Sequence, residues 1–416
     1  MSKVAIIGAG FTGLSAAIRL IDNGVTPTIF EANDSLGGLA GSFKAKSWSW
    51  SLENYYHHIF TNDSDIIEIA KKVGKPAIFR EPLTTSYIKG EELQLDSPIS
   101  VLRFSELSIL SRLWMGGGLL ALKLLPDGLF LEQFRVVDLL PKLVGKRGYK
   151  IIWERLLKAK FGPFVNKVNM AWFWTRVAKR TKQLGYFDGG FSSLLEAMAG
   201  YVIKKGGSIK MGKTVGKIKK RNEKWIVEDE MFDNVLLTVP MPRIEKIVPR
   251  LKVKWPELDY LWSQSLILQL KGSLIKGYWM NILEDNWPFL VVVEQTNMID
   301  KKNYGGSVLL YLGNYLPDGD AKIQMDKNEL LEHFLPYLRK ISPNFSKEDV
   351  TQSWSFESPF AQPVFPTNYS KIIPKMNAGE KGLFVANMSM VYPFDRGTNY
   401  AVKMGNDVAD LILKEI

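Results

Sequence analysis

The 416-residue chain contains no cysteine and only three histidines, His57, His58 and His333. The absence of cysteine excludes disulfides, cysteine-ligated zinc, iron–sulfur clusters and a thiol nucleophile. Three histidines without a repeated ligand spacing also argue against a metal centre built on several imidazoles. We therefore predict no metal site.

Long hydrophobic runs are missing as well. The chain has no stretch of about 20 uncharged apolar residues, which a membrane-spanning helix would need. The nearest candidate, residues 107–125, is interrupted by Arg112, Lys123 and the glycines at 116–118. The first three residues lead directly into an apolar run followed by glycines, which is not the pattern of a signal peptide. These features predict a cytoplasmic protein without a spanning helix.

The net charge of +11 is confined to one segment. Residues 141–182 contain twelve Lys or Arg and a single acid, Glu154, whereas the rest of the chain balances to zero. A segment of one sign attracts anions such as a phosphorylated substrate or lipid headgroups, although a solvated helical face carries the same pattern. We predict no nucleic-acid partner, because no stacking platform or known binding module accompanies the charge.

A peripheral membrane contact is one interpretation of this basic segment. Residues 107–125 are apolar, and together with 141–182 they could rest on the inner face of the membrane. Buried helices that line a substrate cavity would produce the same pattern, so both readings stay open.

The stretch GAGFTGLSAA at residues 8–17 predicts a dinucleotide-binding turn. The apolar run KVAII before it is typical of a buried parallel strand. In the G-x-G-x-x-G pattern, Gly8 permits the tight turn, Gly10 lets the backbone approach a pyrophosphate, and Gly13 lets the following helix pack on the strand. A second strand ends at Glu31, whose carboxylate can accept both hydroxyls of an adenosine ribose.

The residues after Glu31 favour FAD over NAD. The stretch EANDSLGGLAGSF carries a second glycine pair, Gly37-Gly38, that a plain NAD fold does not need. Here the sequence resembles the FAD-binding amine oxidase superfamily, which includes protoporphyrinogen oxidases, carotenoid desaturases and, more distantly, UDP-galactopyranose mutases. Leu39 stands where many amine oxidases have arginine, so that GGLAGSF is more similar to the oxidase, desaturase and mutase branches.

The resemblance implies an α/β fold with a discontinuous, Rossmann-like FAD-binding domain of the glutathione-reductase-like, amine oxidase type and an inserted α+β substrate domain. The FAD-binding domain is expected over residues 1–75, 188–245 and 376–416. The substrate domain is expected over 76–187, which reads as mostly helical, and 246–375, which reads as β-sheet.

The C-terminal segment matches the superfamily in layout. A buried strand is expected at GLFVANM, and an amphipathic helix follows, whose start Thr398 or Asn399 can cap. The resemblance implies that the start of this helix faces the flavin, where its dipole would stabilise negative charge. The sequence DRGTN departs from the usual Gly-Glu opening, which leaves the roles of Asp395 and Arg396 open.

The resemblance implies FAD contacts from segments spread along the whole chain. The expected cofactor-binding residues are Gly8, Gly10, Phe11, Thr12, Gly13, Glu31, Ala32, Gly37, Gly38, Leu39, Val215, Asn387, Gly397, Thr398 and Asn399.

Four side chains are candidates for catalysis: Tyr56, His57, His58 and Arg396. Either imidazole could act as a base, bind an anionic group or hydrogen-bond the flavin, and Tyr56 could line the cavity. Arg396 could stabilise reduced flavin or hold a substrate phosphate. The alternatives are simple packing for the aromatic and imidazole rings, and an ion pair between Arg396 and Asp395.

Three functions remain open. The first is an FAD-dependent oxidoreductase, that is an oxidase, dehydrogenase or desaturase, which takes electrons from a bulky apolar or anionic small molecule onto flavin N5. The second is a redox-neutral enzyme similar to UDP-galactopyranose mutase that acts on a nucleotide sugar. The third is a non-enzymatic flavoprotein scaffold.

Overall fold

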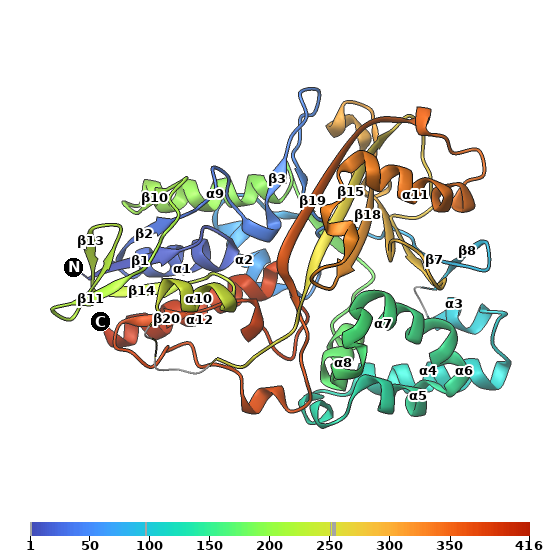
Figure 1. Ribbon diagram of the computed structural model, residues 1–416, viewed down its shortest axis with the longest axis horizontal. Coiled ribbons are helices and arrows are strands. Elements are labelled where there is room, and N and C mark those ends of the chain that lie inside the picture. The colour runs from blue at the N-terminus through green and yellow to red at the C-terminus, as the bar shows by residue number, and fades with distance from the viewer. Residues whose placement is uncertain (1, 96–97, 250, 252–254) are drawn as a thin grey trace.

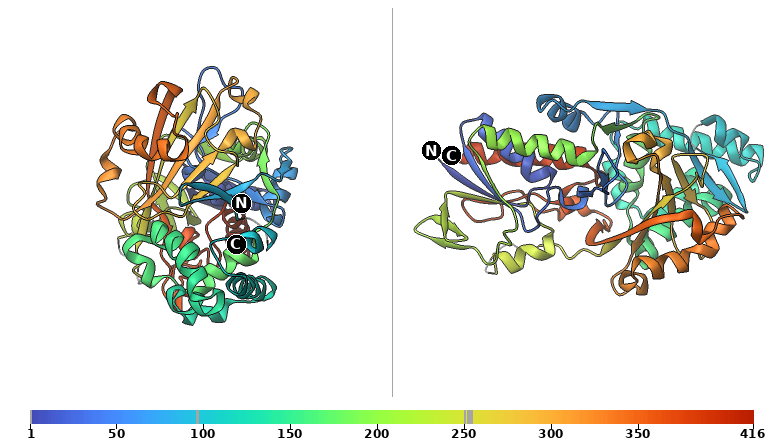
Figure 2. Two further views of the ribbon diagram at one scale, coloured as in Figure 1. Left: turned by 90° about the vertical axis from the view of Figure 1, so that its right-hand side faces the viewer. Right: turned by 90° about the horizontal axis from the view of Figure 1, so that it is seen from above.

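The computed structural model describes residues 2–95, 98–249, 251 and 255–416. Residues 1, 96–97, 250 and 252–254, which the predicted domain ranges include, lie outside the described residues. Figure 1 shows an elongated molecule with both chain ends at the left, in the half that holds the glycine turn. The view from above in Figure 2 shows the second half extending away from these ends.

A five-stranded parallel sheet forms the core of the first half, in the order β10-β2-β1-β14-β20. The strands are β1 (Lys3–Ile7), β2 (Thr26–Phe30), β10 (Ser208–Lys210), β14 (Asn234–Leu237) and β20 (Leu383–Val385). The strands β1, β14 and β20 are apolar and buried, as expected for a parallel sheet that is covered on both faces.

Successive side chains of β1 point to opposite faces of the parallel sheet, and both faces are covered. Val4 and Ile6 pack with helices on one face, and Ala5 and Ile7 pack with a small antiparallel sheet and a short helix on the other. The helices of the first face are α1 (Phe11–Asp22), α9 (Phe191–Lys204) and α12 (Thr398–Glu415), with α2 (Ser64–Lys72) beside α12. The other face is covered by β11 (Lys219–Arg221), β12 (Lys224–Val227), β13 (Glu230–Phe232) and α10 (Met241–Ile247).

A seven-stranded mixed sheet forms the second half, in the order β19-β15-β18-β17-β16-β7-β8. Its strands are β7 (Thr84–Ile88), β8 (Glu91–Gln94), β15 (Tyr260–Leu270), β16 (Trp279–Ile282), β17 (Val291–Glu294), β18 (Val308–Leu316) and β19 (Val350–Pro363). Helix α11 (Lys327–Ile341) packs on one face of this sheet through Leu330, Phe334 and Leu338.

A helical layer lies beneath the seven-stranded sheet, as Figure 1 and the left view of Figure 2 both show. Its elements are α3 (Pro98–Arg103), α4 (Ile109–Leu124), η2 (Leu129–Gln133), α5 (Val136–Val144), α6 (Lys146–Gly148), the π-helical turn η3 (Tyr149–Trp153), α7 (Glu154–Phe161), η4 (Gly162–Lys167) and α8 (Met170–Ala178). Trp172 and Trp174 of α8 belong to its apolar core.

Short strands link the two halves. Strands β5 (Ile59–Phe60) and β6 (Ala77–Arg80) pair with β9 (Leu184–Phe187), and β3 (Ser42–Phe43) pairs with β4 (Leu52–Glu53). The predicted α/β fold class, with a Rossmann-like parallel sheet and an inserted α+β region, is confirmed. Within the described residues, no helix is long and apolar enough to cross a bilayer.

Candidate functional site

The glycine turn between β1 and α1 depends on two close backbone contacts. Gly8 has φ +112°, and a Cβ atom there would lie 2.4 Å from Thr238 Oγ1. A Cβ atom on Gly13 would lie 2.0 Å from the carbonyl oxygen of Gly8. Gly10 differs, because the nearest atom to its Cβ position would be the oxygen of Gly37 at 3.7 Å. The protein itself therefore needs glycine at 8 and 13, whereas at 10 the missing side chain leaves space for a ligand to approach the backbone.

Glu31 lies buried at the end of β2, beside this turn. Its Oε2 atom accepts a hydrogen bond from the Ala9 amide at 2.8 Å. Its Oε1 atom accepts from the amide of Asn33 at 3.0 Å and from Asn33 Nδ2 at 3.1 Å. These three donors fix the orientation of the carboxylate. Oε1 thus already accepts two hydrogen bonds, whereas Oε2 accepts one and keeps acceptor capacity for a ligand hydroxyl.

The segment after β10 runs alongside Glu31. Lys213 donates its amide to the carbonyl of Glu31 at 2.7 Å, and Gly212 donates to Asn33 at 3.0 Å. Val215 follows and is 9% exposed, in the same apolar cluster as Phe30 at the end of β2. The structure therefore places Val215 near the ribose-binding end predicted from the sequence, while Ala32 is exposed beside it.

The second glycine pair joins the first turn through the backbone. Gly37 donates its amide to the carbonyl of Ala9 at 3.1 Å, and its φ of +108° suits glycine. A Cβ atom at Gly37 would lie 2.7 Å from Leu195 in α9. Gly38 and Leu39 then form the short 3₁₀ helix η1 (Gly38–Ala40). Phe11 and Thr12 begin α1 on the other side of Ala9, so this group of predicted cofactor residues is brought together.

The predicted cap of the C-terminal helix is wrong. Helix α12 begins at Thr398, and its N-cap is Gly397, which has no side chain to offer. The Oδ1 atom of Asn399 instead accepts from the amide of Ile66, at 3.1 Å, and so holds the first turn of α2. The first-turn amides of α12 therefore have no side-chain acceptor, and a ligand can use them.

The segment Tyr55–His58 lies between the two halves. Because a carbonyl only accepts, His57 Nδ1 must donate to the oxygen of Tyr55, at 2.6 Å. His58 Nδ1 lies 3.4 Å from the hydroxyl of Tyr278. Burial lowers the pKa of His57 to about 4 and that of His58 to about 3. Both imidazoles are therefore neutral at neutral pH, so each has one donor and one acceptor nitrogen.

Tyr56 packs against the seven-stranded sheet. Its ring makes edge-to-face contacts with Trp279 at 5.0 Å and Tyr311 at 6.0 Å between centroids. Gly313 makes this possible, because a Cβ atom there would lie 2.5 Å from the Tyr56 ring. Burial raises the pKa of Tyr56 to about 12, although the nearby Arg396 opposes the shift. Tyr56 therefore stays protonated and can donate a hydrogen bond.

Arg396 faces the same region but does not pair with Asp395. Its Nη1 atom donates to the carbonyl of Ala361 at 2.9 Å, and its guanidinium lies 4.7 Å from the ring centre of Tyr315. Burial lowers the pKa of Arg396 to about 10, so it remains a cation. The ion pair with Asp395, an alternative left open by the sequence, is not formed.

Asp395 instead binds two cations from the helical layer. Arg176 of α8 makes an ion pair with it, and Lys160 of α7 lies 3.6 Å away. Trp172 donates its indole N–H to Asp395 at 3.2 Å. Lys160 also lies 4.9 Å from the ring of Trp172 and 5.0 Å from that of Tyr315, and burial lowers its pKa well below the usual value.

These residues form a cation cluster, which we define as Lys160, Arg176 and Arg396. Asp395 pairs with Arg176 and lies beside Lys160, whereas Arg396 has no ion-pair partner among the described residues, so Arg396 can attract a further negative charge to the cluster. The sequence pointed to Arg396 and to the basic segment as a whole. Nothing in the sequence indicated that Lys160 is a buried member of the cation cluster, because no spacing distinguishes Lys160 from its basic neighbours.

Glu53 is a second residue that the sequence did not single out. It is 1% exposed, and its carboxylate accepts from the Tyr186 hydroxyl at 2.5 Å and from the Phe191 amide at 2.8 Å. It therefore satisfies the first turn of α9 from 138 residues away. Burial raises the pKa of Glu53 to about 7.

Unpaired buried atoms beside these segments fit a flavin nucleotide. The Oγ atom of Ser42, the Oδ1 atom of Asn54 and the Nδ2 atom of Asn387 are buried without a hydrogen-bond partner among the described residues. Ser42 follows the second glycine pair, Asn54 precedes Tyr55, and Asn387 follows β20. Buried polar groups are normally paired, so donors and acceptors in these positions are consistent with a polar ligand along this path. Together with Glu31 and the open space at Gly10, they fit FAD.

Comparison with known proteins supports this assignment. A family model described as "Flavin containing amine oxidoreductase" matches residues 11–413. Zeta-carotene desaturase of Capsicum annuum is 38% identical over 93 residues, which cover 22% of this chain and 16% of that enzyme.

Solved structures cover far more of the chain. A putative protoporphyrinogen oxidase from Exiguobacterium sp. 255-15 superposes with a TM-score of 0.80 at 15% identity, over 100% of this chain and 99% of the other. Reduced UDP-galactopyranose mutase gives a TM-score of 0.75 at 16% identity, over 100% and 96%. At these identities the likeness establishes the fold.

Proposed function

Since this chain belongs to the family of flavin containing amine oxidoreductases, with FAD as its cofactor, we propose that it oxidises a small molecule that carries an anionic group. The cation cluster is the observation that carries this proposal. Lys160 and Arg176 of the helical layer lie beside Asp395, and Arg396 of the C-terminal segment lies near both of them without pairing with that carboxylate. The desaturase and oxidase relatives support the oxidative chemistry.

Different residues of the chain would bind the cofactor and orient the substrate. Glu31 and the glycine turn would hold the adenosine and pyrophosphate, and the first-turn amides of α12 would face the flavin ring. FAD, when bound, supplies a two-electron acceptor for a C–H or N–H bond of the substrate. Tyr56 would donate a hydrogen bond, and Arg396 would orient the anionic group of the substrate.

A role for Arg396 follows from its surroundings. Its charge influences Tyr55, Tyr56 and His57, the segment that follows the second glycine pair. It is also close to the other two cations, since burial together with its charge lowers the pKa of Lys160, and burial together with the charge of Arg176 lowers the pKa of Arg396 itself. A substrate anion bound to Arg396 would be held close to the wall formed by Tyr55–His58.

The proposal can be tested with flavin absorbance. Purified wild-type protein should be yellow and should release free FAD on acid precipitation. Under anaerobic conditions, amines and apolar compounds with a carboxylate or phosphate should bleach the flavin more readily than uncharged analogues. Arg396→Met should weaken binding of such anions, followed by flavin spectral shifts, by about tenfold or more, because hydrogen bonds to charged groups contribute about 1.5–3 kcal/mol.

Lys220→Met is the matched control. Lys220 also lies over an aromatic ring, 5.6 Å from that of Trp225, but it belongs to the β11–β12 hairpin. Equal anion affinity in wild type and Arg396→Met would exclude the proposed substrate class. A protein that binds no FAD would overturn the cofactor assignment itself.

A redox-neutral reaction on a nucleotide sugar is a second candidate, and the same cation cluster favours it because a diphosphate is doubly anionic. The two functions differ in one measurement. A mutase works only after the flavin has been reduced and leaves its redox state unchanged after turnover. In an oxidoreductase, the substrate itself reduces the flavin and bleaches its absorbance in the absence of any other reductant.

A further inference from the structure

The helical layer exposes an unusual concentration of apolar side chains. Fifteen large hydrophobic residues are exposed among the described residues, and ten of them fall between residues 99 and 134. We call these ten the apolar face. They are Ile99, Leu102, Ile109, Leu110, Leu113, Trp114, Leu120, Leu124, Phe130 and Phe134. Such a concentration on a folded surface marks a site of interaction.

Helix α4 shows that this exposure is not accidental. Its inner face buries Met115 and Leu122, which pack in the core of the helical layer. Its outer face carries Ile109, Leu113, Leu120 and Leu124, which are between 56% and 71% exposed. The spacing of these four residues places them along one side of the helix. A helix at the surface of a protein normally presents polar residues there, and the described residues of the chain leave this outward stripe uncovered.

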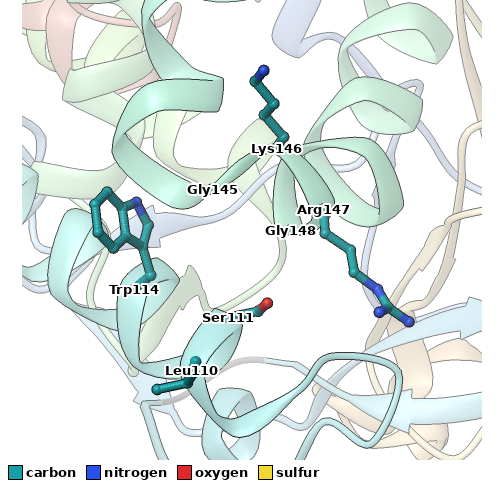
Figure 3. Close-up of a pocket in the computed structure, with 7 residues that line it drawn as sticks. All are labelled: Leu110, Ser111, Trp114, Gly145, Lys146, Arg147 and Gly148. Carbon is teal, nitrogen blue, oxygen red and sulfur yellow. The ribbon is translucent and has the colours of Figure 1, made fainter.

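Basic residues border the apolar face. Leu110 and Trp114 of α4 line a shallow groove of about 250 Å³ together with Lys146 and Arg147. Figure 3 shows these four side chains. The indole N–H of Trp114 donates to the carbonyl of Lys142 at 3.3 Å, which ties the helix to the basic loop. Lys142, Lys146, Arg147 and Lys150 are exposed, and none of them has an ion-pair partner in the described parts of the chain.

We propose that the apolar face docks on a lipid bilayer with anionic headgroups. The apolar side chains of α3, α4 and η2 enter the boundary between headgroups and acyl chains, and Trp114 lies at the level of the headgroups. The basic residues at 142–150 bind lipid phosphates beside it. Figure 1 shows this layer at the end of the molecule far from the two chain ends, so the nucleotide-binding half would stay clear of the bilayer.

Charge complementarity favours a bilayer over a second copy of the chain. A symmetric dimer through the apolar face would bring the same basic loop of both copies close together, and like charges would repel. An anionic bilayer pairs these charges and covers the apolar side chains at once. This inference goes beyond the proposed reaction, because it concerns a surface that contains none of the candidate site residues.

Vesicle sedimentation with the full-length holoprotein tests the docking. Wild type should bind vesicles of phosphatidylcholine with phosphatidylglycerol, and it should bind pure phosphatidylcholine vesicles at least about tenfold more weakly, since each basic residue near an anionic surface contributes roughly fivefold. The variant Leu110→Ser/Leu113→Ser/Leu124→Ser should lower binding to the mixed vesicles by about tenfold or more. Lys146→Gln/Arg147→Gln/Lys150→Gln should remove the preference for the anionic lipid.

The control removes the same number of exposed apolar side chains elsewhere. Ile203, Met231 and Ile372 are 58%, 58% and 50% exposed and lie outside the helical layer. The variant Ile203→Ser/Met231→Ser/Ile372→Ser should bind vesicles as wild type does. Flavin absorbance and the melting temperature report whether each variant remains folded.

Two results would overturn the proposal. One is wild-type protein that stays in the supernatant with both kinds of vesicle. The other is a wild-type dimer in lipid-free buffer, measured by light scattering, that the leucine variant converts to monomers while vesicle binding is absent. A loss of vesicle binding in the control variant equal to that in the leucine variant would also contradict the assignment of the surface.

Discussion

Helices α1 and α12 of the nucleotide-binding half and helix α4 of the helical layer differ in how closely their glycines are packed. In α1, a Cβ atom on Gly13 would meet the Gly8 carbonyl at 2.0 Å, and in α12, one on Gly405 would meet Ser15 at 2.0 Å. Helix α4 of the helical layer carries three consecutive glycines, but a Cβ atom on Gly116 or Gly117 would meet nothing within 4 Å. The third, Gly118, packs against the Leu143 carbonyl.

This difference separates residues that the fold requires from residues that it does not. In the nucleotide-binding half, Gly8, Gly13 and the buried carboxylate of Glu31 have close internal contacts, as Glu31 does with the amide of Ala9. In the helical layer, the exposed leucines and the unpaired basic residues have no such contact. Features without an internal partner therefore point to a partner outside the chain.

Gly13→Ala should give the largest effect. The new methyl group would overlap the Gly8 carbonyl and push α1 away from β1, so we expect a loss of about 3 kcal/mol or more in the free energy of unfolding. FAD retention should fall with it, because the same turn would bind the pyrophosphate. Denaturant unfolding and flavin content after gel filtration measure both effects.

Gly200→Ala is the control for Gly13→Ala in the same half. Gly200 lies in α9, and a Cβ atom there would meet nothing within 4 Å. The control should be as stable as wild type or slightly more stable. A Gly13→Ala protein that keeps wild-type stability and flavin content would contradict the conclusion that glycines are more closely packed in α1 than in α4.

Glu53→Ala should give an intermediate effect. It would leave the Phe191 amide and the Tyr186 hydroxyl without their buried acceptor, and we expect a loss of about 2–3 kcal/mol in the free energy of unfolding. Glu53→Gln keeps one acceptor oxygen and should lose about 1 kcal/mol or less at pH 5.

The pH dependence of Glu53 sharpens this test. Its pKa is raised in the folded state, so the folded protein binds more protons than the unfolded chain between about pH 4.5 and 7. The stability that protonated Glu53 contributes is full below about pH 4.5 and is lost as the pH rises through about 7. The difference in unfolding free energy between wild type and Glu53→Gln should therefore shift in favour of Gln over this range. A constant difference would mean that Glu53 is ionised in the folded protein throughout.

Gly117→Ala in α4 should give the smallest effect, with the opposite sign. Alanine has a higher helix propensity, and the position has room, so we expect a gain of about 0.5–1 kcal/mol in the free energy of unfolding. Flavin content should not change. A destabilised Gly117→Ala protein would show that α4 is as tightly packed as α1 and would weaken the contrast between the halves.

Much of the nucleotide-binding half could be predicted from the sequence. The order of strand, glycine turn, helix, strand and acid is local, and each step has its own residue preference. The prediction failed at the start of α12. Thr398 and Asn399 are both good capping residues, but Gly397 is the N-cap, so both lie inside the first turn of α12, and Asn399 binds the amide of Ile66 in α2 instead.

The candidate substrate site could be predicted only in part. The sequence identified Arg396 and a basic segment, but an ion pair with the neighbouring Asp395 was left open. In the structure, Asp395 binds Arg176, which is 219 residues away along the chain. The packing of the helical layer against the C-terminal segment determines which basic residue reaches a given carboxylate.

The sequence by itself determined the nucleotide-binding turn, because the turn depends on short-range periodicity and on glycines at fixed spacing, and the resemblance of the sequence to a known superfamily implied the cofactor and the fold class. Only the tertiary structure decided that Lys160, Arg176 and Arg396 meet, that Glu53 caps α9, and which side of α4 faces outward. Helix α4 has apolar residues on both its buried and its exposed sides, so the elements that pack against it decide which of these sides is buried.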